Sequence, residues 1–470
     1  MKSRIVLISF LFVGASFLLA SATAFAGGQK EGSSASTSAP AQSMQLQIKT
    51  DSSGFAEPVW PSYTKSASLT VWTWITNATK YGALFEKAFP SVKVDVKSVG
   101  QGQVDYTKLA TAIQAGSGAP DVAQIEFQAL PQFINTGGIL DIAKYVGGVK
   151  PLFPAWAWNQ VTSNGKLYAI PQDAGPEGLI YRKDLFDKYN IPVPKTWAEF
   201  EQAGAALHQA DPSKYLTFFA VNDEGEIMGL LWQGGVFPFK NTPNGWKIDF
   251  TSAAAKKVIN YWVNMVQKGY VKVDNAWTPA WSHELATGTY ASVIGAAWSP
   301  TYEISPYMEK DTTQQWRVAE MPQWKAGDQV DSNWGGSTDA VTTQTKYPEA
   351  AALFAAWLNT EKNLVGLLST GGNQGGSGLF TANLYSSKLP NFNEPNPFLG
   401  GQNANAIYGK MMPWVDKNFE WSPWTSYVYN EMQVEFTAMF AGKISVDQAL
   451  QNIQDKVQGF ARAQGFKVAG

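Results

Sequence analysis

Cysteine is absent from the 470-residue chain, and histidine occurs only at His208 and His283. The chain therefore has no disulfide, no thiolate metal site and no cysteine to carry a lipid anchor. With only two histidines, a metal site or a Ser-His-Asp triad is disfavoured. We expect no metal, no cofactor and no catalytic residue of these kinds.

Features that bind phosphates or nucleic acids are also missing. The glycine-rich stretch GGNQGGSG at 371–378 lacks the lysine of a phosphate-binding loop. The formal net charge is −2, and no long basic run occurs. The sequence therefore predicts neither nucleic acid nor an anionic membrane surface as a partner.

The N-terminus carries the pattern of an export signal. Lys2 and Arg4 precede the apolar stretch Ile5–Ala20, and AFA at 24–26 fits a small-x-small cleavage site. We expect a signal peptide over residues 1–26 and a periplasmic protein without a lipid tether. An uncleaved membrane anchor is disfavoured because the apolar stretch is short for a span.

A flexible spacer is predicted next, over residues 27–66, because this segment is rich in Gly, Ser, Ala, Thr and Gln. From Ser68 the chain alternates between strand patterns (SLTVWTW, VKVDVKSV, PDVAQIE) and helical patterns. A second such stretch follows, with capping boxes at 196–199 and 445–448. The alternation predicts two α/β lobes with helices beside each sheet.

Two acids, Asp173 and Glu177, lie in QDAGPE between the strand patterns KLYAIP and GLIYRK. They could be the acid pair of a secreted glycosidase or lyase, with Glu126 as another partner for Asp173. However, catalytic carboxylates usually come from separate, rigidly held strand ends, and these two share one Gly/Pro-rich connection. We favour a binding protein in which Asp173 accepts hydroxyl hydrogen bonds and Glu177 is a solvated loop acid.

Tryptophan is abundant, with 19 residues, and several follow predicted strands or precede glycine pairs. Ligands bind at the carboxyl ends of strands in open α/β sheets. An indole face can stack on the C–H face of a sugar, and carboxylates accept its hydroxyl protons. The candidates at such positions are Trp72, Trp74, Trp232, Trp277, Trp298 and Trp334, with Glu126 after the strand DVAQI. Trp197, Trp262 and Trp357 lie on apolar helix stripes and are expected in the core.

Six ordered stretches carry a family resemblance: SLTVWTW, GSGAPDVAQIEFQALPQFINTGGILDI, NGKLYAIPQDAGPEGLIYRKDLFDKYNIPVPKTWAEF, YASVIGAAW, NWGGSTDAVTTQTKYPEAAALFAAWLN and GKISVDQALQNIQDKV. With them the chain resembles the extracellular solute-binding proteins of family 1, the sugar-binding components of ABC importers, and is similar to maltodextrin-binding proteins. The resemblance covers nearly all of the chain after the signal.

This resemblance implies a two-lobed periplasmic-binding-protein fold of type II, in which each lobe is an α/β sheet flanked by helices and the ligand cleft lies at the hinge. The first lobe would comprise residues 67–174 plus 338–372, and the second 175–337 plus 373–470. Gly175, Pro176 and Gly178 would belong to the hinge.

The resemblance also implies a site and a function. The ligand-binding residues would be Trp72, Trp74, Glu126, Asp173, Trp232, Trp277, Trp298, Gly335 and Gly336, with Phe127, Trp334 and Trp421 beside them. The protein would capture a small oligosaccharide and deliver it to the membrane permease of an ABC importer with a separate ATPase. It would act as a monomer and not as an enzyme. A binder of an amino acid or polyamine, and a secreted glycosidase, remain alternatives.

Overall fold

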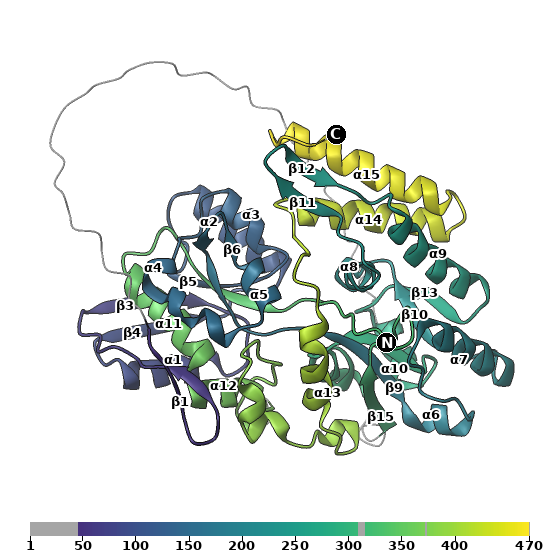
Figure 1. Cartoon of the computed structure of the whole chain (residues 1–470), viewed down its shortest axis with the longest axis horizontal. Coiled ribbons are helices and arrows are strands. Elements are labelled where there is room, and N and C mark those ends of the chain that lie inside the picture. The colour runs from purple at the N-terminus through teal and green to yellow at the C-terminus, as the bar shows by residue number, and fades with distance from the viewer. Residues whose placement is uncertain (1–45, 309–314, 372–373, 470) are drawn as a thin grey trace, which may run out of the picture. The chain divides into compact units, whose positions relative to one another are not determined.

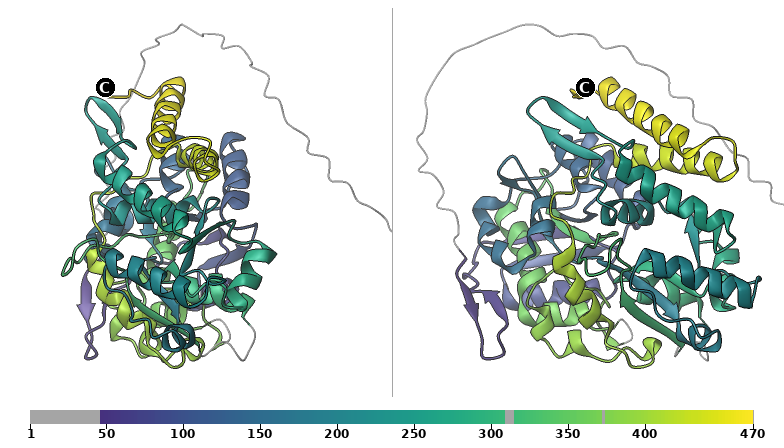
Figure 2. Two further views of the ribbon diagram at one scale, coloured as in Figure 1. Left: turned by 90° about the vertical axis from the view of Figure 1, so that its right-hand side faces the viewer. Right: turned by 45° about the vertical axis from the view of Figure 1, so that its right-hand side comes forward.

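The computed structural model describes residues 46–308, 315–371 and 374–469 (Figure 1). The predicted signal peptide lies outside the described residues, as does the first part of the predicted spacer. In the described part of the chain, two groups of strands are each flanked by helices, on the left and right of Figure 1 and again in Figure 2. The predicted two-lobed α/β architecture is confirmed.

The first lobe is built on a five-stranded sheet in the order β4-β3-β5-β16-β8. The first three strands of this order are mutually parallel, as the alternating strand and helix patterns predicted, and β16 runs antiparallel to both of its neighbours. The strands are β3 (Ala67–Trp72), β4 (Val92–Lys97), β5 (Val122–Glu126), β8 (Ala169–Pro171) and β16 (Ser337–Val341).

Aromatic packing joins the helices of the first lobe to this sheet. Phe85 of α1 meets Trp357 of α11 edge-on, with ring centroids 5.4 Å apart, so Trp357 is a core residue as predicted. Every residue of α11 after its first two is buried. The helices are α1 (Ala78–Ala88), α2 (Gln103–Gln114), α3 (Leu130–Asn135), α4 (Ala143–Val146), α5 (Ala155–Gln160), α11 (Pro348–Thr360) and α12 (Lys362–Ser369). Short strands β6 (Thr162–Ser163) and β7 (Lys166–Leu167) form a hairpin after α5.

The folded body begins earlier than the predicted spacer allowed. β1 (Ile48–Thr50) pairs with β2 (Ala56–Pro58) in an antiparallel hairpin. Phe55 in its turn is fully buried against Tyr385, and Lys362 of α12 forms an ion pair with Asp51. The buried Phe55 side chain thus fixes the β1–β2 hairpin to the first lobe. The polar composition of this segment had suggested a flexible linker.

The second lobe has a central antiparallel sheet, β14-β9-β15, and a parallel pair, β10-β13. A parallel bridge between Tyr215 and Tyr290 links the two. The strands are β9 (Glu177–Arg182), β10 (Thr217–Ala220), β13 (Val271–Asp274), β14 (Ser292–Ala296) and β15 (Trp316–Glu320). A separate hairpin is formed by β11 (Phe239–Thr242) and β12 (Gly245–Ile248).

The helices of the second lobe begin where the capping patterns predicted. Thr196 accepts a hydrogen bond from the Glu199 amide (3.1 Å), and Ser445 accepts one from the Gln448 amide (3.2 Å). Trp197 and Trp262 are buried core residues, as predicted. The helices are α6 (Lys183–Lys188), α7 (Trp197–Ala210), α8 (Glu224–Gln233), α9 (Ala253–Gln267), α10 (Pro279–Ala286), α14 (Thr425–Phe440) and α15 (Val446–Ala463).

Two of the segments that pass between the lobes run side by side. The first crossing leaves β8 and enters β9, and the second crossing leaves β15 and enters β16. The Trp334 amide donates to the Gly175 carbonyl (2.9 Å), and the Gly175 amide donates to the side-chain oxygen of Asn333 (2.7 Å). A side chain at Gly175 would place its Cβ 2.0 Å from the Trp334 carbonyl oxygen, so only glycine permits this approach.

The third crossing follows α13 (Ala404–Met411) and leads to α14. Residues after 372, which were predicted to lie in the second lobe, first pack on the first lobe, because the Leu379 and Leu384 amides donate to the carbonyls of Leu368 and Leu152. The chain then reaches the second crossing, where the Asp331 amide donates to the Trp414 carbonyl (3.0 Å). Among the described helices, none is long and apolar enough to cross a membrane.

The close approach at Gly175 makes a stability prediction. We expect Gly175→Ala to lower the free energy of unfolding by about 1–3 kcal/mol, because the new Cβ overlaps a backbone oxygen that is itself hydrogen-bonded. Urea denaturation followed by tryptophan fluorescence would measure the change. The matched control is Gly459→Ala on α15, where a Cβ meets no atom within 4 Å and helix propensity favours alanine. An unchanged midpoint for Gly175→Ala would contradict the steric account.

Candidate functional site

The ends of two adjacent parallel strands build the first-lobe side of the site. β3 ends at Trp72, β5 ends at Glu126, and the two strands pair directly. Gln124 holds the chain after β3, since its side-chain oxygen accepts from the Thr73 hydroxyl (2.6 Å) and the Trp74 amide (3.1 Å). Its amide nitrogen donates to the Ser337 hydroxyl (2.9 Å). Trp72 and Trp74 are both half-buried at this edge.

Glu126 is held by a tyrosine that the sequence did not mark. The Tyr106 hydroxyl donates to Glu126 Oε2 (2.6 Å), and the Tyr106 ring meets Trp74 edge-on at 6.3 Å. Burial raises the pKa of Glu126 above its ordinary value, although the bond from Tyr106 opposes that rise. The result is a compact group of Trp74, Tyr106 and Glu126, with a carboxylate and two aromatic rings.

Asp173 lies in the first crossing, as predicted. Its Oδ1 accepts from the Ser337 amide (2.8 Å), which ties the first crossing to the start of β16. Burial raises its pKa to about 6, and the nearby charge of Glu126 acts in the same direction. The Glu126 and Asp173 carboxylates are therefore electrostatically coupled.

Three tryptophans gather on the second-lobe side. The Trp298 ring lies 4.7 Å from that of Trp334 and 6.5 Å from that of Trp277, and it is nearly parallel to the latter. Trp298 Nε1 donates to the Trp334 carbonyl (3.0 Å), so its ring is anchored to the second crossing. Trp277 keeps 42% of its surface exposed. The structure thus brings these three predicted residues together.

Asp223 belongs to the same group, although the sequence analysis missed it. Trp277 Nε1 donates to its Oδ2 (2.7 Å), and Asp223 lies three residues after the end of β10, as the N-cap of α8. Burial raises the pKa of Asp223 to about 6, with a further contribution from the charge of Glu126. The charge of Glu126 in the first lobe therefore acts on Asp223 in the second. The strand-end rule that selected Glu126 would also have selected Asp223.

The two glycines at the second crossing act through the backbone. Gly335 and Gly336 have φ of 68° and 83°, a region that glycine adopts without strain. A Cβ at Gly335 would lie 3.1 Å from Trp298 Nε1, and one at Gly336 would lie 2.9 Å from the Asp173 carbonyl oxygen. The pair therefore lets the chain pass between side chains of the site.

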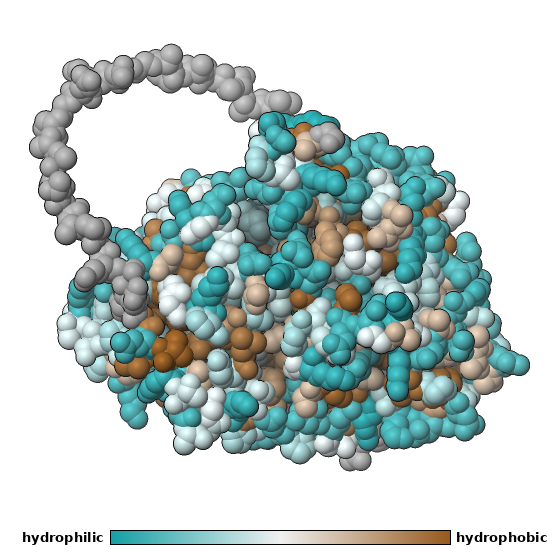
Figure 3. All heavy atoms as spheres, in the orientation of Figure 1, coloured by the Kyte–Doolittle hydropathy of each residue, from teal (hydrophilic) through white to brown (hydrophobic). Residues whose placement is uncertain are grey.

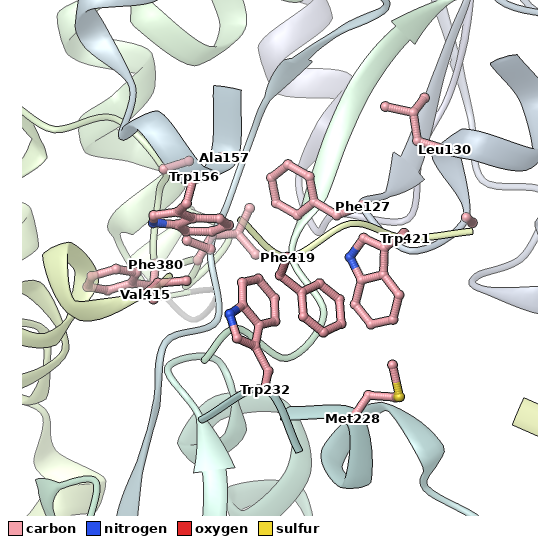
Figure 4. Packing of buried hydrophobic residues seen from close by; sticks show 14 of the residues in the cluster. Phe127, Leu130, Trp156, Ala157, Met228, Trp232, Phe380, Val415, Phe419 and Trp421 are labelled. Atoms are coloured by element: carbon pink, nitrogen blue, oxygen red, sulfur yellow. The ribbon is translucent and has the colours of Figure 1, made fainter. Parts of the chain in front are cut away.

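Trp232 lies elsewhere, and its predicted contact with ligand needs correction. It is fully buried in α8 and stacks on Phe419, with ring centroids 4.0 Å apart and planes within 12° (Figure 4). Phe127 is also fully buried, against Trp156. Trp421 lies on the other side of Phe419, with ring centroids 4.8 Å apart, and is only 7% exposed. These residues form the apolar packing between the lobes and the third crossing.

Glu177 is not the solvated loop acid that the sequence suggested. It opens β9, is fully buried and accepts from the Ser332 hydroxyl. Gly229 of α8 leaves room for it, since a Cβ there would lie 2.0 Å from Glu177 Oε2. Burial raises its pKa to about 8. The position after Pro176 resembled a polar turn, but the residue packs inside the second lobe beside the hinge.

Among the described residues, no group of three or more His, Cys, Asp or Glu side chains has the arrangement of a metal site. The site is instead a set of indole faces and carboxylates, divided between two lobes and connected through paired crossing strands. Such an arrangement defines a two-lobed solute-binding protein.

The chain belongs to the family of bacterial extracellular solute-binding proteins, which it matches over residues 80–375. The binding protein from B. animalis subsp. lactis, solved with β-1,6-galactobiose, is 26% identical, with a TM-score of 0.72 and coverage of 86% of this chain and 100% of that one. The galacto-N-biose/lacto-N-biose I-binding protein of Bifidobacterium longum, solved with lacto-N-biose, is 22% identical, with a TM-score of 0.74 and coverage of 86% and 99%. The fold is that of type II periplasmic binding proteins.

Curated relatives carry sugar-binding names. The arabinooligosaccharide-binding proteins of Halalkalibacterium halodurans and Bacillus subtilis are each 24% identical, over 54% and 58% of this chain. These matches span only 57% and 64% of the two relatives. The lactose-binding protein of Rhizobium radiobacter is 22% identical over 84% of this chain and 93% of its own length.

The buried Glu177 predicts a pH dependence of stability. Its pKa is raised from 4.5 to about 8, so the folded protein holds a proton that the unfolded chain releases between these values. The stabilising contribution is complete below about pH 4.5 and is lost as pH rises towards 8. Glu177→Gln cannot ionise and keeps an acceptor for Ser332.

We therefore expect the wild type to lose stability relative to Glu177→Gln between about pH 5 and pH 8, by on the order of a few kcal/mol. Urea titrations at several pH values would measure it. Glu394→Gln, at an exposed side chain, is the control and should track the wild type. A constant offset between wild type and Glu177→Gln at all pH values would refute the assignment.

Proposed function

We propose that this protein is the sugar-binding component of an ABC importer, which captures a small oligosaccharide between its lobes and presents it to a membrane permease. The observation that carries the proposal is the group of Trp277, Trp298 and Trp334 on one lobe, opposite Trp74 and Glu126 on the other. The sugars bound by the solved and curated relatives support the same ligand class.

The chemistry of the site suits a neutral, hydroxyl-rich ligand. Indole rings offer flat apolar faces for the C–H side of a pyranose ring. Asp173 and Asp223 supply acceptor oxygens for hydroxyl groups, one from the first crossing and one from the second lobe. Because these acceptors belong to different lobes, a sugar that contacts both stabilises the closed arrangement by its additional contacts there.

Export and delivery complete the proposal. Residues 1–26 would be removed as a signal peptide, and the protein would act as a periplasmic monomer. A permease and a separate ATPase would take over the ligand and supply the energy. The family is extracellular, which supports this location.

Capture without catalysis is part of the proposal. Glu177, the alternative acid partner of Asp173, is enclosed beside the hinge and bonded to Ser332. A glycosidic bond cannot reach its carboxylate without unfolding the packing around it. The acid pair of a glycosidase is therefore not assembled from these two residues.

A second candidate ligand is a cationic solute such as a polyamine. The observation that favours it is the set of three carboxylates Glu126, Asp173 and Asp223. Burial raises the pKa of both aspartates to about 6, and the charge of Glu126 adds to each rise. A cation would bind the ionised forms, so its affinity should rise with pH through this range. Sugar binding requires no such titration, and the two ligand classes are therefore separable.

Truncation of the most exposed of these tryptophans tests the sugar proposal. We expect Trp277→Ala to weaken binding of a disaccharide by about ten- to a hundredfold, because a stacking face and the fixed position of Asp223 are both lost. Titration calorimetry would measure the affinity, after a thermal-shift screen of sugars, amino acids and polyamines has identified a ligand. The control is Trp60→Ala, at a half-buried tryptophan on the first lobe. A thermal shift with polyamines alone would favour the cationic candidate.

A hydrolysis assay tests the absence of catalysis. We expect no release of chromophore from aryl glycosides, since Glu177, the acid four residues from Asp173, is fully buried and bonded to Ser332. Asp173→Asn should change ligand affinity only. Turnover that Asp173→Asn abolishes would show that the protein is an enzyme.

A further inference from the structure

A cavity of about 900 Å³ lies outside the group of Trp277, Trp298 and Trp334. The first lobe contributes α3 and the stretch from Asn159 to Tyr168, and the second contributes the β11–β12 hairpin. Residues 417–423 of the third crossing form another wall. The surface is hollowed between these elements in the upper part of Figure 3. A volume of this size lies within the range of small-molecule binding sites.

The cavity is lined by side-chain amides from each of its walls. Asn135, Asn159 and Gln160 come from the first lobe, Asn241 from the hairpin, and Asn418 from the third crossing. An amide both donates and accepts hydrogen bonds, which matches the double character of a sugar hydroxyl. Tyr168, Trp246 and Trp421 add aromatic rings to the same lining. Proteins use amides and aromatic rings of this kind to bind carbohydrates. The lining does not gather charges of a single sign.

Buried hydrogen-bonding groups at this cavity have no partner within the described chain. Both the amide nitrogen and the amide oxygen of Gln160 are unpaired, as is Nε1 of Trp421. Unpaired buried polar groups are rare because each costs about 1–3 kcal/mol, and a bound ligand or water commonly accounts for them. Gln160 on the first-lobe wall and Trp421 on the wall formed by the third crossing thus each leave a buried polar group for a polar ligand.

The walls are fixed to each other before any ligand arrives. Lys240 of the hairpin forms an ion pair with Glu420, whose other oxygen accepts from the Asn241 amide (2.9 Å). On the opposite side, the Asn159 side chain donates to the Lys417 carbonyl (3.2 Å). Trp246 meets Trp424 edge-on at 5.2 Å. Because the third crossing is bonded to both lobes, the cavity is shaped in advance and its amides need little ordering.

Trp421 of the cavity lining connects the cavity to the region of Glu126 in the first lobe. α3 begins shortly after Glu126, and Trp421 lies beside Phe127, as Figure 4 shows. Trp421 also lies 6.4 Å from Tyr429 of α14, whose pKa is raised mainly by burial and further by the charges of Glu126, Glu224 and Asp223. Trp421 therefore lies between the cavity and the part of the first lobe that carries Glu126.

We propose that this cavity is an accessory subsite for the distal residues of an oligosaccharide whose first residues lie among Trp277, Trp298 and Trp334. The inference rests on the proposed sugar-binding function and extends it to chain length. The ligand would pass Trp421, and its distal hydroxyl groups would pair with the amides of Gln160, Asn159 and Asn241. The protein would then distinguish a longer oligosaccharide from a disaccharide of the same linkage.

A series of ligands that differ only in length tests the subsite. Titration calorimetry of the full-length protein would use β-1,6-linked galacto-oligosaccharides and α-1,5-linked arabino-oligosaccharides, each as di-, tri- and tetrasaccharide. Gln160→Ala removes the unpaired amide, and Asn135→Trp fills the cavity from the end of α3. Lys166→Trp, at an exposed position of β7 outside the lining, is the matched control.

We expect the tetrasaccharide to bind wild type more tightly than the disaccharide. Both cavity variants should weaken tetrasaccharide binding by about five- to tenfold while leaving disaccharide affinity unchanged. Lys166→Trp should leave both affinities unchanged. Equal affinity for all lengths, or equal losses for the di- and tetrasaccharide, would overturn the subsite but not the sugar-binding function. If no saccharide binds wild type, the proposed function itself fails, and the subsite with it.

Discussion

The contact between the first and second crossings is the constraint on which the rest of the site depends. Gly175 and Trp334 exchange a backbone hydrogen bond, and the Asn333 side chain accepts from the Gly175 amide while its own amide donates to the Gly335 carbonyl. Residues on both sides of the proposed site are held in place by this contact. Trp298 Nε1 donates a hydrogen bond to the Trp334 carbonyl, and Asp173 Oδ1 accepts one from the Ser337 amide. Motion between the lobes must therefore pass through residues that also hold Trp298 and Asp173, two residues of the proposed site.

Desolvation of carboxylates follows from the same packing. Glu177 and Asp331 enter the hinge from the two crossings, and burial raises the pKa of each. At the proposed ligand site, Glu126 and Asp223 come from opposite lobes. Burial raises the pKa of Asp223, and the charge of Glu126 adds to that rise. Like charges that meet across a cleft oppose its closure unless donors separate them. In the proposed function, the ligand hydroxyl groups are those donors, so ligand and closure are coupled electrostatically.

Local patterns in the sequence predicted much of the fold. Hydrophobic periodicity located the strands and helices, and the capping boxes at Thr196 and Ser445 marked where α7 and α15 begin. The strand-end rule found Glu126 but was applied mainly to tryptophans, so it passed over Asp223. No pattern in the sequence indicated that the Trp232 side chain points into the core. Its direction becomes evident only from the structure, where it stacks on Phe419. Contacts between residues far apart in sequence, such as Gly175 with Trp334, leave no local pattern at all.

The third crossing contributes Phe419 and Trp421 to one aromatic cluster with Trp232. Phe419 lies between Trp232 of α8 and Trp421, so the buried tryptophan fixes the position of the one beside the cavity. Trp232 thus contributes to the proposed subsite without contacting ligand, because loss of its ring would release Phe419 and with it Trp421. In the proposed function, the hinge sets where the sugar-binding residues lie, and the packing around Phe419 sets how far beyond them the site extends. Affinity and chain-length preference can then vary separately, since they depend on different crossings of the same fold.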